Sequence, residues 1–252
     1  MDASELYDPE FRKLIKSKKP TVIIPVGSLE QHGAHLPITT DSDIVTEIAS
    51  RLAKKCGFIV FPAVSYGVSF EHKPFINTSI SPKTYADFLS DVIYSQVYNG
   101  IWSIIILNGH HGNTRCIEQL ENSFLLTSNS PGIKESRSGR EARKAAYKRL
   151  KVRSYSYWRY MKHEFDHAGF VETSLMLAIS DKVKMKKAKK GLIMDNLSKL
   201  EQSAAKKLST QEGGFPQVAK NGVWGDPTNA TKKDGKKFLA EIVRNLAKEC
   251  QS

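Results

Sequence analysis

The 252-residue sequence has few cysteines and no long apolar run, and each absence excludes a class of protein. Cys56, Cys116 and Cys250 are far apart and form no CxxC pair, so we predict buried free thiols in a reducing cytoplasm. No apolar run approaches the roughly 20 residues that span a bilayer. The acidic, polar residues 1–5 predict no signal peptide. Together these features predict a cytoplasmic protein without a membrane partner.

The sequence also lacks the common motifs of covalent catalysis and nucleotide binding. It has no GxSxG nucleophile elbow, no cysteine beside a histidine, and no GxxxxGK[ST] phosphate-binding loop. A hydrolytic reaction in this chain would therefore need another source of a nucleophile.

The net charge of +12 comes from two basic stretches, 134–153 and 182–207. Each contains nine Lys or Arg and two Asp or Glu, so the rest of the chain is close to neutral. The run Lys186–Lys190 has no interleaved aromatic residue that could stack on bases. We therefore predict solvated surfaces rather than nucleic-acid partners, although a basic nucleic-acid-binding protein on an inactive hydrolase fold stays an alternative.

Apolar strand-like runs alternate with segments of helical periodicity, which predicts a single α/β domain over residues 1–252. The expected architecture is a three-layer αβα sandwich with a mainly parallel central sheet. The expected strands are 21–26, 58–64, 102–107 and 152–158. The expected helices are one from about 44 that Gly57 ends, one that Ser81 and Pro82 begin, one through 117–125, and those over 171–179 and about 231–249. Residues 127–145, rich in Ser, Gly and charge, are expected to form a mobile surface segment.

Three polar clusters stand out, and two of them directly follow predicted strands. The carboxyl ends of parallel strands share one edge of a sheet, so the clusters should meet there. Carboxylate and imidazole groups converging on one point are typical divalent-metal ligands. The clusters are Glu30, His32, His35 and Asp41; Asn108, His110, His111 and Asn113; and Asp166, His167 and Glu172.

The number of candidate ligands indicates two metal ions rather than one. A mononuclear zinc site needs three protein ligands, and at least five candidates of mixed type are present here. Two ions sharing a carboxylate can hold and acidify a water and stabilise an oxyanion. A dimetal phosphoesterase is a second possibility from these residues, but the chain lacks the early Asp-x-His pair of that chemistry.

Four segments together resemble the signatures of the creatininase family over residues 20–240. They are Glu30-Gln31-His32-Gly33-Ala34-His35-Leu36-Pro37 with Asp41, Asn108-Gly109-His110-His111-Gly112-Asn113, His167-Ala168-Gly169-Phe170-Val171-Glu172-Thr173-Ser174 and Gly222-Val223-Trp224-Gly225-Asp226-Pro227. The resemblance implies a metal-dependent hydrolase of non-peptide C–N bonds in cyclic amides or formamides. It also implies an αβα fold and a homo-oligomer, with hexamers among the family's assemblies.

The resemblance assigns roles to particular residues. It implies two divalent ions (Zn, Mn or Fe) held by Glu30, His32, Asp41 and His110, with Asp41 bridging. Glu172 would be a further ligand or would orient the attacking water. His167 would be the proton shuttle, which suits an imidazole with its pKa near neutrality.

The second motif departs from creatininase, which has Tyr-Glu-Asn where this chain has His111-Gly112-Asn113. One metal ligand is thereby missing, and Glu172 is the predicted substitute. Trp158 matches one aromatic residue of the creatinine pocket, and His163 stands near the place of a second. We predict substrate contacts from His111, Asn113, Trp158 and His163. Creatinine hydrolysis and deformylation of a ribosylaminopyrimidine phosphate are the alternative substrate assignments.

Overall fold

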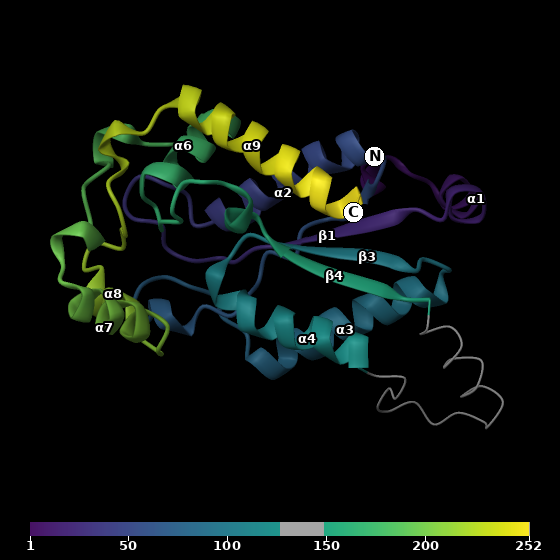
Figure 1. Ribbon diagram of the computed structural model, residues 1–252, viewed down its shortest axis with the longest axis horizontal. Coiled ribbons are helices and arrows are strands. Elements are labelled where there is room, and N and C mark those ends of the chain that lie inside the picture. The colour runs from purple at the N-terminus through teal and green to yellow at the C-terminus, as the bar shows by residue number, and fades with distance from the viewer. Residues whose placement is uncertain (127–148, 252) are drawn as a thin grey trace.

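The computed structural model describes residues 1–126 and 149–251, and its centre is a four-stranded parallel sheet (Figure 1). The strands β1 (Thr21–Val26), β2 (Ile59–Val60), β3 (Ser103–Asn108) and β4 (Lys151–Ser156) lie in the order β2-β1-β3-β4. Val26 pairs with Asn108 and Asn108 with Ser156, so three strands end level with one another. The predicted parallel sheet is confirmed.

Helices cover both faces of this sheet, which confirms the three-layer architecture (Figure 1). On one face α2 (Thr40–Cys56), α6 (Phe170–Ile179) and α9 (Lys232–Gln251) pack against one another. On the other face lie α3 (Pro82–Tyr98) and α4 (Thr114–Leu126). Alternate side chains of β1 pack on opposite faces of the sheet. Ile23 belongs to one buried apolar cluster, and Val22 and Ile24 belong to the other.

Local sequence signals explain where two of these helices begin and end. Gly57 ends α2 in the left-handed conformation at φ 73°, which glycine adopts without steric cost. Ser81 begins α3 by accepting a hydrogen bond from the Thr84 backbone N–H, with Pro82 in the first turn. Both boundaries agree with prediction.

Some elements differ from prediction. The strand expected over 58–64 pairs with β1 only at Ile59–Val60, apart from one bridge between Val64 and Val26. Two helices have no counterpart among the expected elements, α1 (Asp8–Lys18) and α7 (Lys199–Ser209). The segment predicted to be mobile, 127–145, lies outside the described residues. The remaining short elements are α8 (Phe215–Val218) and the 3₁₀ turns Ala3–Glu5, Phe70–His72, His111–Asn113, Tyr157–Tyr160, Met185–Lys187, Met194–Asn196 and Pro227–Asn229.

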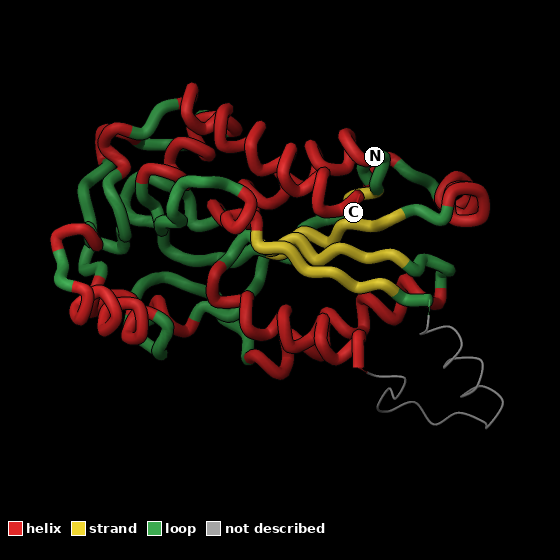
Figure 2. Tube along the Cα trace, in the orientation of Figure 1, coloured by secondary structure: helices red, strands yellow, loops and turns green. Residues whose placement is uncertain are grey.

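Connecting segments gather beyond the carboxyl ends of the strands, at the end of the molecule that also carries α7 and α8 (Figure 2). One of them follows β2 and is anchored beside the first motif, because the backbone N–H of Gln31 donates to Ile76 O. In the described part of the chain, no helix is long and apolar enough to cross a membrane.

Candidate metal centre

The end of β1 and the start of α2 bring the side chains of Glu30, His32 and Asp41 close together. Glu30 and His32 are fully buried, and Asp41 is 2% exposed. Asp41 lies in the first turn of α2, where unpaired backbone N–H groups favour a negative charge. The Ser28 hydroxyl donates to Glu30 Oε2 at 2.9 Å. The predicted convergence of these three side chains is therefore present.

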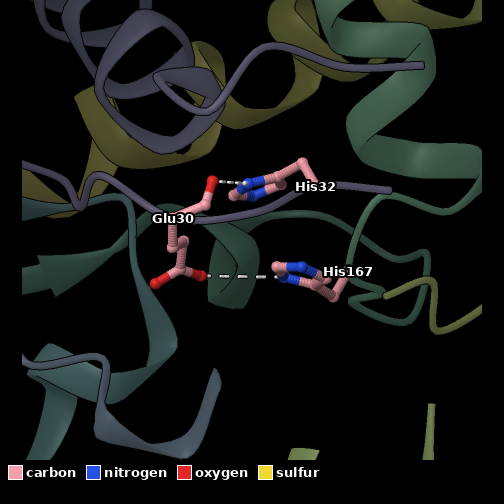
Figure 3. Close-up of side chains that lie close together, drawn as sticks. All are labelled: Glu30, His32 and His167. Carbon is pink, nitrogen blue, oxygen red and sulfur yellow. Dashed lines mark hydrogen bonds and ion pairs between the residues drawn. The ribbon is translucent and has the colours of Figure 1, made fainter. Parts of the chain in front are cut away.

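His110, His167 and Glu172 join the group from the other two motifs. His110 follows β3, and Glu172 lies in the first turn of α6, where its Oε2 accepts from the Ala168 N–H at 2.7 Å. The rings of His167 and His32 have centroids 4.2 Å apart. Figure 3 shows His167 reaching toward the carboxylate of Glu30, with His167 Nδ1 3.9 Å from Glu30 Oε1.

Two sets of possible ligand atoms share Asp41. In each set all atoms lie within 4.8 Å of one another. We call Glu30, Asp41 and His110 the Glu30 half, and His32, Asp41 and Glu172 the Glu172 half. Asp41 Oδ2 is 3.0 Å from His110 Nδ1, and Asp41 Oδ1 is 3.1 Å from His32 Nε2. One carboxylate thus faces both halves, as a bridging ligand would.

Backbone carbonyls fix the tautomers of both imidazoles. His32 Nδ1 lies 3.1 Å from Glu30 O, and His110 Nε2 lies 2.9 Å from Val68 O. A carbonyl oxygen only accepts, so these nitrogens carry the hydrogen. In the neutral rings the opposite nitrogens, His32 Nε2 and His110 Nδ1, then carry the lone pairs, and both face carboxylates. This second contact on the rear nitrogen is the usual arrangement of metal-binding histidines.

Three buried carboxylate oxygens of the described cluster have no hydrogen-bond partner: Glu30 Oε1, Asp41 Oδ2 and Glu172 Oε1. Buried charge is costly unless a counter-charge or a metal compensates it. Oxygen and imidazole donors around shared points suit Zn, Mn or Fe. The residues therefore fit the pair of divalent cations that the resemblance implies, while the ligand roles themselves stay predictions.

Burial and charge shift the pKa values of the two glutamates in opposite directions. At Glu30 burial raises the pKa, but the charges of the neighbouring imidazoles, His110 first, outweigh it and hold the pKa well below its ordinary value. At Glu172 burial dominates and raises the pKa to about 8. Burial lowers the pKa of His32, but Asp41 and Glu172 outweigh it and raise that pKa to about 10. In the metal-free protein His32 and Glu172 therefore hold their protons to higher pH than usual, which shows that this cluster attracts positive charge.

Other residues of the motifs support the cluster rather than entering it. His35 Nε2 lies 2.9 Å from the hydroxyl of Thr173, the neighbour of Glu172, so it orients a candidate ligand's helix. Asp166 accepts from the backbone N–H groups of Val171 and Glu172 and thereby caps α6.

The side-chain amide of Asn113 is bound by backbone groups. Its Oδ1 accepts from Val68 N and its Nδ2 donates to Gly27 O, so its amide ties two backbone segments together. The substrate-binding role of Asn113 stays a prediction.

His111, Trp158 and His163 fall into two places. His111 lies 6.0 Å from Trp158 between ring centroids, and Trp158 stacks on Phe165 at 4.7 Å. These rings form an aromatic wall beside the second motif, and the substrate-binding roles of His111 and Trp158 stay predictions. His163 is exposed and lies against Phe170 and Phe238 instead, which places it apart from that wall.

Glu71 and His72 carry no firm signal in the sequence, yet both lie at the cluster. His72 is 2% exposed, and its Nε2 is 3.0 Å from Glu30 Oε1. Glu71 Oε1 is 3.6 Å from His110 Nε2. A Cβ at Gly112 would meet Glu71 Oε1 at 2.6 Å and Val68 O at 2.2 Å. The segment that carries Glu71 and His72 therefore fills the space where a ligand side chain at position 112 would have to begin.

Comparisons with known proteins agree with this geometry. The family model described as "Creatininase: Creatinine amidohydrolase" matches residues 4–250. A mycofactocin precursor peptide peptidase of Mycolicibacterium smegmatis is 33% identical over 241 residues, covering 92% of this chain and 85% of the relative. A 2-amino-5-formylamino-6-ribosylaminopyrimidin-4(3H)-one 5'-monophosphate deformylase of Methanosphaera stadtmanae is 35% identical over 109 residues, 39% of this chain and 43% of the relative.

Solved structures show the same fold. A crystal structure of creatinine amidohydrolase (creatininase) superposes with a TM-score of 0.75 at 23% identity, covering 98% of this chain and 95% of that one. The match of the family model to almost the full length, together with the peptidase relative, shows that this chain belongs to the creatininase family.

Proposed function

We propose that this chain is a dinuclear metal-dependent amidohydrolase. One observation carries the proposal: buried, unpartnered oxygens of Glu30, Asp41 and Glu172 converge with histidine nitrogens whose tautomers leave lone pairs facing them. Bound divalent ions would acidify a water and stabilise the oxyanion that forms on a carbonyl. We expect the protein to form a homo-oligomer and to hydrolyse a small-molecule amide.

The chain's own residues have separate tasks in this proposal. Asp41 holds the two halves in register by offering one oxygen to each. Glu172 orients the attacking water or completes the second half. His167, partly buried next to His32 and 3.9 Å from Glu30 Oε1, carries a proton from the water to the leaving nitrogen. The aromatic wall of His111, Trp158 and Phe165 would hold a planar or apolar part of the substrate.

The scissile bond is the finer part of the proposal. We assign a non-peptide C–N bond in a cyclic amide or formamide, with creatinine hydrolysis and the ribosylaminopyrimidine deformylation as its specific alternatives. A peptide bond is a second candidate, because the relative that covers 92% of this chain is named a peptide peptidase.

A substrate panel tests these assignments. Metal-loaded protein is incubated with creatinine and other cyclic amides, with formamides, and with short peptides, and products are identified by mass spectrometry. Glu30→Gln serves as the blank because it removes a candidate ligand at nearly unchanged volume. We expect turnover of cyclic amides or formamides by the parent protein. Turnover of peptides alone would replace the non-peptide assignment, and absence of metal uptake by the parent protein would remove the amidohydrolase proposal.

A further inference from the structure

Gln31 lies between two candidate ligands, and its amide orientation is fixed by the backbone. The Gly33 N–H donates to Gln31 Oε1 at 2.9 Å. A flipped amide would place its NH₂ group against that N–H, which is a clash of two donors. Gln31 Nε2 therefore faces away from Gly33, 3.1 Å from His72 Nδ1.

This contact selects one tautomer of His72. An amide nitrogen donates and does not accept, so His72 Nδ1 has to accept from Gln31. In a neutral ring the hydrogen is then on Nε2. That nitrogen is 3.0 Å from Glu30 Oε1, in a setting where both side chains are buried. With its hydrogen in that position, Nε2 of His72 has no lone pair to offer a cation, so the ring acts on Glu30 rather than as a ligand.

His72 and Ser28 hold the Glu30 carboxylate from its two oxygens. The Ser28 hydroxyl donates to Oε2 at 2.9 Å, and His72 Nε2 lies beside Oε1. The two atoms are close, but the hydrogen bond between them is not aligned, because Oε1 has no hydrogen-bond partner. A small rotation of the carboxylate would align it. The ring is kept in place by Phe215, whose centroid is 4.5 Å away.

We propose that His72, held in its Nε2–H tautomer by Gln31, is a positioning residue that orients Glu30 and sets the cation affinity of the Glu30 half. The inference rests on the proposed function, since it needs a cation at that half. Partners that orient metal ligands commonly change affinity by about 10- to 100-fold when removed. The carboxylate of Glu172 is oriented by the Ala168 N–H instead of by His72. Loss of His72 should therefore change the cation affinity of the Glu30 half only.

Calorimetric titration of the metal-free protein with Mn²⁺ tests the inference. Glu30→Gln first identifies the binding event of the Glu30 half, as the event that it abolishes. We expect His72→Phe to weaken this event by about 10- to 100-fold and to leave the other event unchanged. His72→Gln retains a donor near the position of Nε2 and should recover most of the lost affinity. Tyr85→Phe, which changes a buried ring on α3 outside the cluster, is the control and should bind as the parent does.

Two results would overturn the inference. His72→Phe could bind both ions like the parent protein, or His72→Gln could be as weak as His72→Phe, which would make the ring a packing element or a ligand. Absence of metal uptake by the parent protein would instead remove the proposed function. The two failures are therefore distinguishable.

A spectroscopic measurement on the unaltered chain does not depend on the folding of any variant. In ¹⁵N-histidine-labelled, metal-free protein, the His72 ring should show a hydrogen on Nε2 and none on Nδ1. His72→Phe assigns the resonances. Gln31→Leu should abolish the preference for one tautomer and weaken the same Mn²⁺ event. A protonated Nδ1 in the parent protein would refute the proposed hydrogen bond from Gln31.

Discussion

The Glu30 half and the Glu172 half share Asp41 but are built from different parts of the fold. Glu30 and His110 follow neighbouring strands of the sheet, whereas Glu172 lies in the first turn of α6. The pKa of Glu30 is held well below its ordinary value, and burial raises that of Glu172 to about 8. The Glu30 half therefore has its glutamate ionised before any cation binds. In the Glu172 half, the glutamate becomes charged only when it loses its proton.

The largest expected effect comes from the residue that the halves share. Asp41→Asn should abolish both metal-binding events, because its oxygens face His110 and His32 at 3.0 and 3.1 Å. Metal ions supply several kcal/mol of transition-state stabilisation, so kcat/KM should fall by at least about 1,000-fold. Elemental analysis and steady-state kinetics measure the two effects. Asp43→Asn, in the same helical turn, is the matched control. Retention of one full equivalent of metal by Asp41→Asn would show that the halves are independent.

The next effect separates the halves from each other. Glu30→Gln and Glu172→Gln should each abolish one Mn²⁺ binding event, as measured by calorimetry. We expect Glu30→Gln to lower kcat/KM by about 100- to 1,000-fold and Glu172→Gln by about 10- to 100-fold. The difference follows from the raised pKa of Glu172, whose carboxyl group is already largely neutral near pH 7 in the metal-free protein. Equal losses of affinity and activity would indicate that the halves are equivalent.

A smaller effect concerns pH. Glu172 keeps its proton up to about pH 8 in the metal-free protein, while Glu30 is ionised far below that pH. His32 and His110, both with raised pKa values, also have to lose a proton before they bind a cation. Falling pH should therefore weaken both events, and should weaken the event of the Glu172 half more steeply.

Proton counting measures this difference. Calorimetric titrations near pH 7, in buffers with different ionisation heats, give the number of protons released in each event. We expect about one more proton from the Glu172 half than from the Glu30 half. The same number from both would contradict the assigned order of the two glutamate pKa values.

The smallest expected effect comes from an exposed surface outside both halves. Lys186, Lys187, Lys189 and Lys190 belong to the second basic stretch, and all of them are exposed. Replacing all four by Gln should leave both metal-binding events and hydrolysis within about twofold of the parent, since exposed charges act weakly over distance at physiological salt. Loss of hydrolysis in a folded variant would give this stretch a substrate-binding role. Salt-dependent RNA or DNA binding that the variant loses would support the nucleic-acid alternative.

The sequence predicted the parts of the molecule that follow regular rules. Parallel strands end at one edge, so the residues that follow Val26 and Asn108 could be placed together from the sequence alone. His72 could not be placed in this way. Its segment has no periodicity, and its path depends on distant backbone bonds such as Thr78 N to Leu29 O. The residue type of Asn113 likewise does not reveal that its amide binds backbone on two sides.

The close packing around Gly112 limits how this centre could change by mutation. A side chain there would begin 2.5 Å from His110 Nε2 and 2.2 Å from Val68 O. Gly112→Glu alone would therefore displace the backbone that fixes the His110 tautomer before it could add a ligand. A carboxylate at position 112 therefore requires residues 68–72 to take another course, so position 112 and that segment would have to change together.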